Sequence, residues 1–231
     1  MPGMLGEIAR QLGTVWYWIP GREFYARSLP PDPPSPSSSY CWPIGANRSK
    51  WFHRFKENSG PTGMGCFGYR RKNGVRGHAG TDLKGRYKDP VVAVTDGQIV
   101  SFYDFYNGVY ALVVDHGNFV INYGEVDRDS LTQLGLSAKH TRYDKQKGGF
   151  VSGTGSTVKA GQQIGFVGRM RSGSSMLHFE IYQAGTEYNK RWTNWPTGYP
   201  SGLLNAEKFL LKLSGSRVVK KEVKIATAVC R

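Results

Sequence analysis

Cysteines and long apolar runs are both scarce in this sequence. Three cysteines in 231 residues, Cys41, Cys66 and Cys230, are too few and too scattered for a disulfide framework or a cysteine-based zinc site. They leave open a bridge between Cys41 and Cys66, although free thiols are favoured. No run is long enough to span a membrane, and residues 1–21 lack the basic and apolar segments of a secretory signal. We therefore expect a protein made in the cytoplasm that leaves it, if at all, without a cleaved signal.

Acidic residues are also few. Asp and Glu number 17 against 31 Lys and Arg, which gives a formal net charge of +14. Such a charge attracts polyanions and anionic surfaces at long range, but it does not identify one of them. A generally basic, soluble surface without a dedicated partner fits equally well. None of the usual nucleic-acid-binding motifs is present, so the sequence disfavours nucleic acid as the partner.

Glycine and proline are plentiful, and they set the expected fold class. The 30 glycines and 12 prolines separate short runs rich in β-branched and aromatic residues, which predicts a mainly β protein with many turns. With 39% hydrophobic residues, the chain can bury one domain core.

A change of composition divides the chain. The stretch LPPDPPSPSSSY, residues 29–40, has the composition of an extended linker that packs no core. Before it, LGEIARQLGTVWYWI predicts a short amphipathic helix followed by a docking segment. We expect residues 1–40 to be a docking segment and linker, residues 41–215 the folded domain, and residues 216–231 a tail.

Within the domain, alternating apolar residues predict the strands. Residues 89–105 predict two strands around Asp96 and Gly97, and residues 110–126 predict a second pair turning at residues 116–118. A charged, glycine-rich insertion over residues 127–155 interrupts this pattern. Two strand-like stretches follow, and NAEKFLLKLSG, residues 205–215, predicts a helix ended by Gly215.

Three residues have the side chains of an open zinc site. His78 and Asp82 lie four apart in GHAGTDL, an even spacing that places both on one face of an extended chain, and Gly80 lets the chain bend. His178 lies in MLHFEIY. Two imidazoles and one carboxylate are the ligands of a catalytic zinc whose fourth position is left to water.

These motifs, in this order, resemble those of the lysostaphin-type (LytM-like) zinc endopeptidases, which cut peptidoglycan cross-bridges. The resemblance covers about residues 68–182 and includes GHAGTDL, DPVVAVTDGQIV, VVDHGNFVINYGE, VKAGQQIGFVG and LHFEIY. It implies a small twisted antiparallel β-sheet of the LytM (duplicated hybrid motif-like) type, with a groove above it. It also implies zinc at the groove floor, held by His78, Asp82 and His178.

The sequence departs from the family pattern at two positions, both of which belong to the catalytic site. The family has a second histidine in the last strand, where this chain has Met176, and a histidine where this chain has Glu125. Period-two alternation predicts that Glu125 shares a face with Tyr123, and Met176 with His178, so that all four side chains point into the site.

Two interpretations of these substitutions stay open. A thioether does not titrate, so Met176 can contribute only packing. Glutamate is the general base of the zinc proteases with the H-E-x-x-H motif, so Glu125 is expected to replace the missing base. The alternative is an inactive domain that has kept the fold and its ligands. The apt chemistry of glutamate favours activity.

Other residues receive weaker predictions. Tyr123, Met176, His116 and His140 are candidates for substrate binding, although a structural role suits His116 and a solvated loop suits His140. His53 is read as part of an aromatic cluster. A second set of aromatic residues offers a binding wall or, more simply, a cover for the core: Trp192, Trp195 and Tyr199.

The sequence thus favours a zinc-dependent peptidoglycan hydrolase, either an endopeptidase or an amidase acting on the wall peptide. The docking segment suggests a component of a phage tail or of a contractile secretion system, acting at the cell wall or periplasm after delivery, or on the virion. The alternatives are a non-catalytic module that binds the cell wall or forms part of a tail tip, and a polyanion-binding protein.

Overall fold

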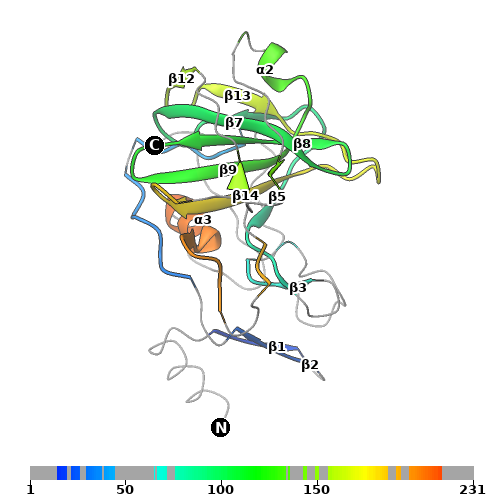
Figure 1. Cartoon of the computed structure of the whole chain (residues 1–231), viewed down its shortest axis with the longest axis vertical. Coiled ribbons are helices and arrows are strands. Elements are labelled where there is room, and N and C mark those ends of the chain that lie inside the picture. Colours follow the sequence, from blue (N-terminus) through cyan, green and yellow to red (C-terminus); the bar gives the residue numbers. More distant parts are fainter. Residues whose placement is uncertain are drawn as a thin grey trace.

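The protein is built on one twisted antiparallel sheet, seen in a computed structural model (Figure 1). The structure describes residues 15–19, 22–26, 30–37, 39–44, 65, 67–71, 76–133, 135, 143–144, 149–150, 156–186, 191–193 and 198–214. The main sheet has seven strands in the order β12-β7-β8-β9-β14-β15, with β5 also paired to β14. They are β5 (Thr81–Lys84), β7 (Gly97–Tyr106), β8 (Val109–Asp115), β9 (Phe119–Val126), β12 (Thr157–Val158), β14 (Met176–Gln183) and β15 (Leu203–Leu204).

Four smaller antiparallel pairs and two helices complete the described elements. The pairs are β1 (Val15–Ile19) with β2 (Arg22–Ala26), β3 (Arg70–Arg71) with β4 (Arg76–Gly77), β6 (Pro90–Val92) with β13 (Gln163–Phe166), and β10 (Tyr143–Asp144) with β11 (Gly149–Phe150). The helices are α2 (Ser130–Gln133) and α3 (Ala206–Ser214). This content confirms the mainly β fold with short helices.

The two faces of the sheet differ in chemistry. Phe179 lies opposite Tyr123 in the pairing of β14 with β9, and the rings of Phe179 and Phe119 lie 6.1 and 5.5 Å from that of Phe209 on α3. The odd-numbered residues from Phe119 to Tyr123 on β9 and from Leu177 to Ile181 on β14 therefore form an apolar face covered by the helix. The even-numbered residues point the other way, because side chains alternate along a strand, and they include the polar His178.

The helix predicted near the C-terminal end of the domain is confirmed. Asn205 caps α3, because its Oδ1 accepts a hydrogen bond from the backbone N–H of Lys208 at 3.0 Å. Leu210 and Leu213 are buried along one side of the helix. Gly215, predicted to end α3, lies outside the described residues.

The strand pair expected around Asp96 and Gly97 is only half correct. Both strands exist, and so does the pair β8–β9 turning at residues 116–118, but β6 pairs with β13 while β7 pairs with β8 and β12. The side chain of Asp96 explains the difference. It accepts hydrogen bonds from the backbone N–H of Ala160 at 2.9 Å and from Lys159 Nζ at 2.8 Å, so it fixes the turn between β12 and β13 instead of closing a hairpin.

Near the N-terminus, the expectation of free thiols is wrong for Cys41, which is disulfide-bonded. The short helix predicted at the start of LGEIARQLGTVWYWI lies outside the described residues, and Val15–Ile19, at the end of that stretch, forms a strand. Cys66 and Cys230 are outside the described residues. Cys41 is buried, and its backbone N–H donates to the carbonyl of Val94 at 2.7 Å, so the segment that follows the linker is tied to the core.

The Pro/Ser-rich segment runs beside α3 (Figure 1). The backbone N–H of Asn205 donates to the carbonyl of Pro31 at 3.1 Å, and Lys208 Nζ pairs with Asp32 at 2.7 Å. Pro30 and Pro33 are buried. Residues 30–33 therefore contact the domain, and the useful place to cut the chain lies before them. No helix in the described part of the chain has the length and apolar character needed to cross a membrane.

Two truncations test this boundary. Removing residues 1–29 should leave the melting temperature of the remainder within about 2 °C, because no described contact of the main sheet is lost. Removing residues 1–39 should lower it by about 3–10 °C, because buried prolines and the contacts to α3 are lost. Thermal unfolding followed by circular dichroism measures both. Equal melting temperatures would show that residues 30–39 contribute nothing to stability.

Candidate metal centre

Strands β5 and β14 and the segment after β4 bring the predicted ligands together. His178 on β14 lies directly opposite Asp82 on β5, so both side chains rise from the same face of the sheet. His78 follows β4 and reaches them through a bend at Gly80. A Cβ on Gly80 would lie only 2.6 Å from Cε1 of His178 and 2.8 Å from the carbonyl oxygen of Phe179. Glycine is thus required for the close approach.

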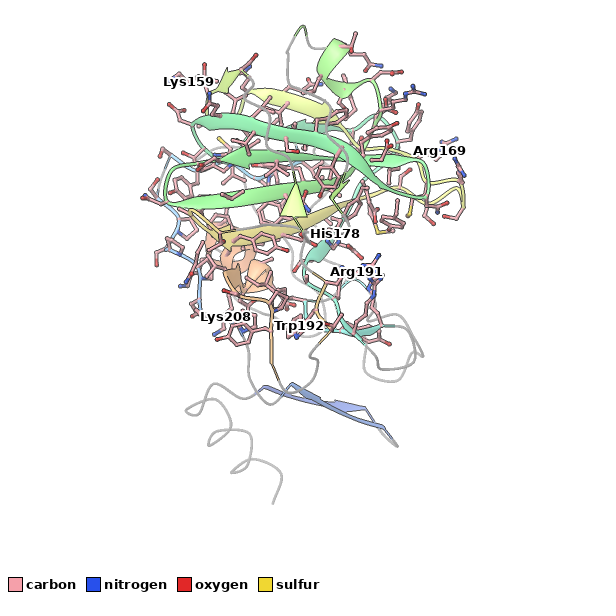
Figure 2. All side chains as sticks on the ribbon, in the orientation of Figure 1. Lys159, Arg169, His178, Arg191, Trp192 and Lys208 are labelled. Atoms are coloured by element: carbon pink, nitrogen blue, oxygen red, sulfur yellow. The ribbon has the colours of Figure 1, made fainter. Side chains whose placement is uncertain are left out.

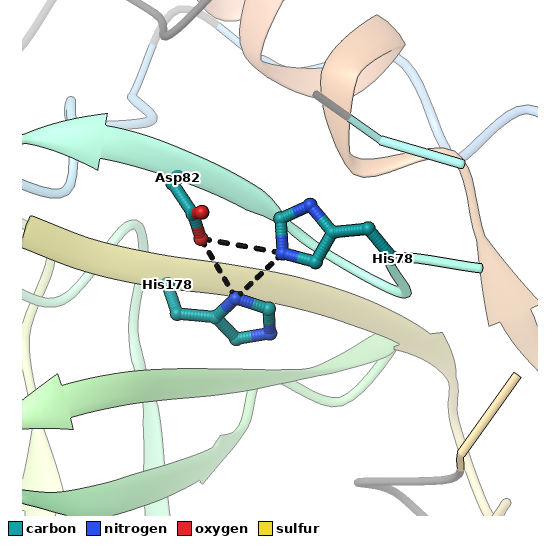
Figure 3. A group of neighbouring side chains, drawn as sticks. All are labelled: His78, Asp82 and His178. Carbon is teal, nitrogen blue, oxygen red and sulfur yellow. Dashed lines mark hydrogen bonds and ion pairs between the residues drawn. The ribbon is translucent and has the colours of Figure 1, made fainter. Parts of the chain in front are cut away.

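The three ligand atoms form a tight triangle (Figure 3). His78 Nε2 lies 3.0 Å from His178 Nδ1 and 3.3 Å from Asp82 Oδ1, and His178 Nδ1 lies 2.9 Å from the same oxygen. All three residues are buried. Among the described residues, this is the one group of three or more His, Cys, Asp or Glu side chains close enough to hold a metal ion.

Zinc fits this triangle. Zinc ligands at about 2.0–2.1 Å in a tetrahedron are separated by about 3.3 Å, close to the separations of the three atoms. Two imidazoles with one carboxylate leave a fourth position open, which is the arrangement of catalytic zinc sites. The donors therefore suit zinc in number, type and spacing.

A second layer of hydrogen bonds orients His178. Its Nε2 lies 2.8 Å from Glu180 Oε1, which turns Nδ1 toward the other two ligands. Glu180 is held in turn through its Oε2, which accepts from Asn122 Nδ2 and from the hydroxyl of Tyr182, both at 2.9 Å. A carboxylate behind a ligating histidine fixes its ring and increases its basicity. Glu180 lies two residues after His178 on the same strand, so strand alternation in the sequence could have predicted that the two side chains share a face.

The charges of the cluster shift its pKa values. Burial would raise the pKa of Asp82, but the two histidines outweigh it and hold that pKa well below its usual range. Burial lowers the pKa of His78. Burial also disfavours the charged form of His178, but its hydrogen bonds to Asp82 and Glu180 outweigh this and raise its pKa. Arg71 Nη2 donates to Asp82 Oδ2 at 3.0 Å and so fixes the oxygen that does not face the histidines.

Glu125 reaches the site by an unexpected route. Alternation predicted that Glu125 and Tyr123 share a face, and this is wrong. A β-bulge interrupts the pairing of β8 with β9 between Tyr110 and Ala111, and Glu125 has a left-handed φ of 64°. The extra residue breaks the alternation. Asp82 and His178 consequently both act on the charge of Glu125, whereas Tyr123 stays on the face beneath α3.

The carboxyl group of Glu125 is buried and half satisfied. Its Oε1 accepts a short hydrogen bond from the hydroxyl of Tyr106. Its Oε2 is buried and has no hydrogen-bond partner among the described residues. Burial, followed by the charge of Asp82, raises the pKa of Glu125 to about 7. One oxygen therefore remains free to accept a proton or a hydrogen bond. Nothing in the sequence singled out Tyr106.

The remaining sequence candidates lie in different places. Met176 shares the His178 face of β14 and is partly exposed. Tyr123 is fully buried, and its hydroxyl accepts from the backbone N–H of Val94 at 3.0 Å and lies 3.2 Å from His116 Nε2. The other ring nitrogen of His116 lies 3.0 Å from the carbonyl oxygen of Asp96. His116 and Tyr123 thus form a polar link on the face away from the cluster.

Of the remaining candidates, several lie outside the described residues and one covers the core. His140, His53 and Trp195 are outside the described residues. Trp192 is buried with its ring 5.5 Å from that of Phe67, so it covers the core.

Gly124 lies directly opposite His178, and a Cβ there would come within 3.2 Å of the His178 side chain. The glycine therefore leaves room on β9 for the imidazole.

Comparisons with solved structures find zinc and M23 peptidases. A zinc-containing peptidase from Vibrio cholerae is 19% identical over 81% of this chain and 47% of its own, with a TM-score of 0.41. The catalytic domain of a mutant of the prophage-encoded M23 protein EnpA from Enterococcus faecalis is 20% identical over 71% of this chain and 94% of its own, with a TM-score of 0.40. Lysostaphin is 25% identical over 56% of this chain and 46% of its own, with a TM-score of 0.37.

The chain spans about half the length of the Vibrio peptidase. No family model and no curated protein matches the sequence. Since each TM-score is below 0.5, the function has to be judged from the side chains of this chain.

Zinc binding is the direct test of the cluster. The purified protein should hold about one zinc per chain, and His178→Ala should lose it, because two ligands do not retain the ion. Glu180→Gln should keep the site but weaken zinc affinity by about 10–100-fold. Metal analysis and competition with a chelator measure both. Asp129→Asn, at an exposed residue before α2, is the control and should bind zinc normally. Unchanged zinc content in His178→Ala would refute the assignment.

Proposed function

We propose that this chain is a zinc-dependent hydrolase of the peptide part of bacterial peptidoglycan, acting as an endopeptidase or an amidase. The observation that carries the proposal is the buried His78–Asp82–His178 triangle, with the free carboxylate oxygen of Glu125 on the same side of the sheet. The motif resemblance to the lysostaphin-type enzymes supports the choice of substrate.

Amide hydrolysis requires an activated water, a base and stabilisation of the developing negative charge. Zinc held by His78, Asp82 and His178 would supply a Lewis acid that polarises the scissile carbonyl and lowers the pKa of a water molecule. Glu180 keeps the His178 ring in the orientation that this requires. Arg71 holds the second oxygen of Asp82, so that the first oxygen faces the histidines.

Glu125 is the base in this proposal. Its Oε2 accepts the proton of the attacking water, while Tyr106 holds Oε1 in place through its hydroxyl. A pKa near 7 suits a group that must accept and then release a proton near neutral pH. Met176 takes no part in proton transfer, because a thioether neither titrates nor donates a strong hydrogen bond.

The second candidate function is a module that binds the cell wall, or forms part of a tail tip, without cutting. It is favoured by the replacement of both non-ligand histidines of the family, at Glu125 and Met176. In that case the zinc triangle serves stability or binding alone. The two functions differ in a single measurable property, the release of fragments from peptidoglycan.

We also propose that residues 1–29 attach the domain to a larger assembly, such as a phage tail or a contractile secretion system, which delivers it to the cell wall or periplasm or carries it on the virion. The support is the separate β1–β2 pair, which shares no strand with the main sheet and is followed by the proline-rich segment. The net charge of +14 favours contact with anionic wall polymers.

The substitution Glu125→Gln tests the proposed base. The amide keeps the shape of the side chain but cannot accept the proton, so turnover of purified peptidoglycan should fall by about 10²–10⁴-fold while zinc stays bound. Fragment release measured by chromatography, together with metal analysis, gives both quantities. Met176→His, which restores the residue of the family, should change the rate far less.

Two results would contradict this mechanism. Full activity of Glu125→Gln would remove the glutamate from the chemistry. A zinc-loaded wild-type protein that releases no fragments from peptidoglycans of differing cross-bridge would instead favour the binding module.

A further inference from the structure

Three arginines lie on the metal side of the small sheet that carries His78. Arg71 on β3 is directly opposite Arg76 on β4, so the two side chains share a face. Arg76 and His78 are two residues apart, and the backbone of His78 continues the pairing, because its N–H donates to the carbonyl of Tyr69 at 2.8 Å. Alternation therefore places Arg76 on the same side as the ligand.

Arg191 joins this face from a distant part of the sequence. Gly77 bridges Trp192 in antiparallel fashion, with the N–H of Gly77 donating to the Trp192 carbonyl at 2.9 Å. In such a pair the residue after Gly77 lies beside the residue before Trp192, so Arg191 flanks His78. The Trp192 side chain is buried on the opposite side, which leaves Arg191 on the metal side. In the view of Figure 2, Arg191 lies just below His178, and Arg169 lies at the right edge of the molecule.

Two of these arginines have no counter-ion among the described residues. Arg71 is paired with Asp82, but neither Arg76 nor Arg191 forms an ion pair with any residue that the structure describes. The Nε–H of Arg76 is buried and has no hydrogen-bond acceptor among the residues that the structure describes. A buried donor of a charged group without an acceptor is costly.

The arginines also repel one another. Arg76 lies directly opposite Arg71 and on the same side as Arg191, so three positive charges gather on this side of the small sheet. A guanidinium cannot lose its proton in a protein, so the repulsion is relieved by an anion. Among the described carboxylates of the cluster, Asp82 and Glu180 are already paired, and Glu125, whose Oε1 is held by Tyr106, forms no ion pair with either arginine. Asp82 serves Arg71 and the histidines, and Glu180 serves His178, Asn122 and Tyr182.

We propose that Arg76 and Arg191 form a carboxylate-binding subsite beside the metal cluster. The inference rests on the proposed peptide hydrolase and narrows its substrate to a peptide that carries a carboxylate within a few residues of the scissile bond. The planar guanidinium fork matches a carboxylate with two hydrogen bonds, which a lysine does not do. The carboxylate comes either from a free C-terminus or from an acidic side chain of the peptide.

Two pairs of peptides separate these sources. N-acetyl-alanyl-alanine and its C-terminal amide differ only in the terminal carboxylate. N-acetyl-glutamyl-alaninamide and N-acetyl-glutaminyl-alaninamide differ only in a side-chain carboxylate. Titration calorimetry with the zinc-loaded full chain, in a Glu125→Gln background that suppresses turnover, gives the affinity for each. The acid member of at least one pair should bind about tenfold or more tightly than its amide.

Arginine substitutions locate this preference. Arg76→Gln and Arg191→Gln should each reduce the preference for the acid to about threefold or less at unchanged zinc content, because a charge-assisted hydrogen bond is lost. Arg76→Lys keeps the charge without the fork and should be intermediate. Arg169→Gln is the matched control, since that guanidinium lies 4.8 Å from the ring of Tyr87, and it should keep the full preference. Melting temperatures verify that each variant is folded.

Two binding results would refute the subsite. Equal binding of acids and amides in both pairs overturns the subsite. A preference that persists in folded Arg76→Gln and Arg191→Gln also overturns it, because the carboxylate would then sit on the metal. Neither result depends on catalysis. If the protein cuts peptidoglycan without preferring acids, the proposed function stands and the subsite is refuted. If it prefers acids without cutting peptidoglycan, the subsite stands and the proposed function is refuted.

Discussion

The contact of His178 with Asp82 across β5 and β14 is the constraint on which the rest of the site depends. It requires the two strands to pair in one register, because a shift of one residue would turn one ligand to the apolar face. Burying the two charged groups together is costly unless each remaining polar atom is satisfied. Arg71 meets this need for Asp82 and Glu180 meets it for His178, which makes the neighbouring strands part of the metal site.

The sequence predicted the parts of the site that follow from local spacing. The His-x-x-x-Asp spacing, the strand holding His178 and the bend at Gly80 are all local, and the structure brings these residues together. The position of Glu125 on the metal side was predicted for the wrong reason. Strict alternation would have placed Glu125 beneath α3 with Tyr123, and a bulge has no reliable signature in a single sequence.

Long-range contacts account for what the sequence could not supply. Asp96 was expected to turn a hairpin, but its side chain binds residues more than 60 positions later. Arg191 meets Arg76 only because the segment around Trp192 joins the edge of β4. The proline-rich stretch has the composition of a free linker, yet it contacts the start of α3, because the cap residue Asn205 offers a backbone N–H and the helix offers Lys208. The composition of a segment indicates its conformational preference, but it does not show which residues the segment contacts.

The bulge in β9 separates chemistry from folding at one position. Elsewhere in the central strands, a side chain that faces the metal is tied by register to others that fill the core, so its replacement disturbs both. Residue 125 stands outside the ladder, with a left-handed backbone that glutamate tolerates and that histidine, asparagine and aspartate adopt more readily than most residues. Strand pairing therefore does not fix the identity of this side chain, which makes the position a natural point at which the protein can acquire, lose or alter a reaction.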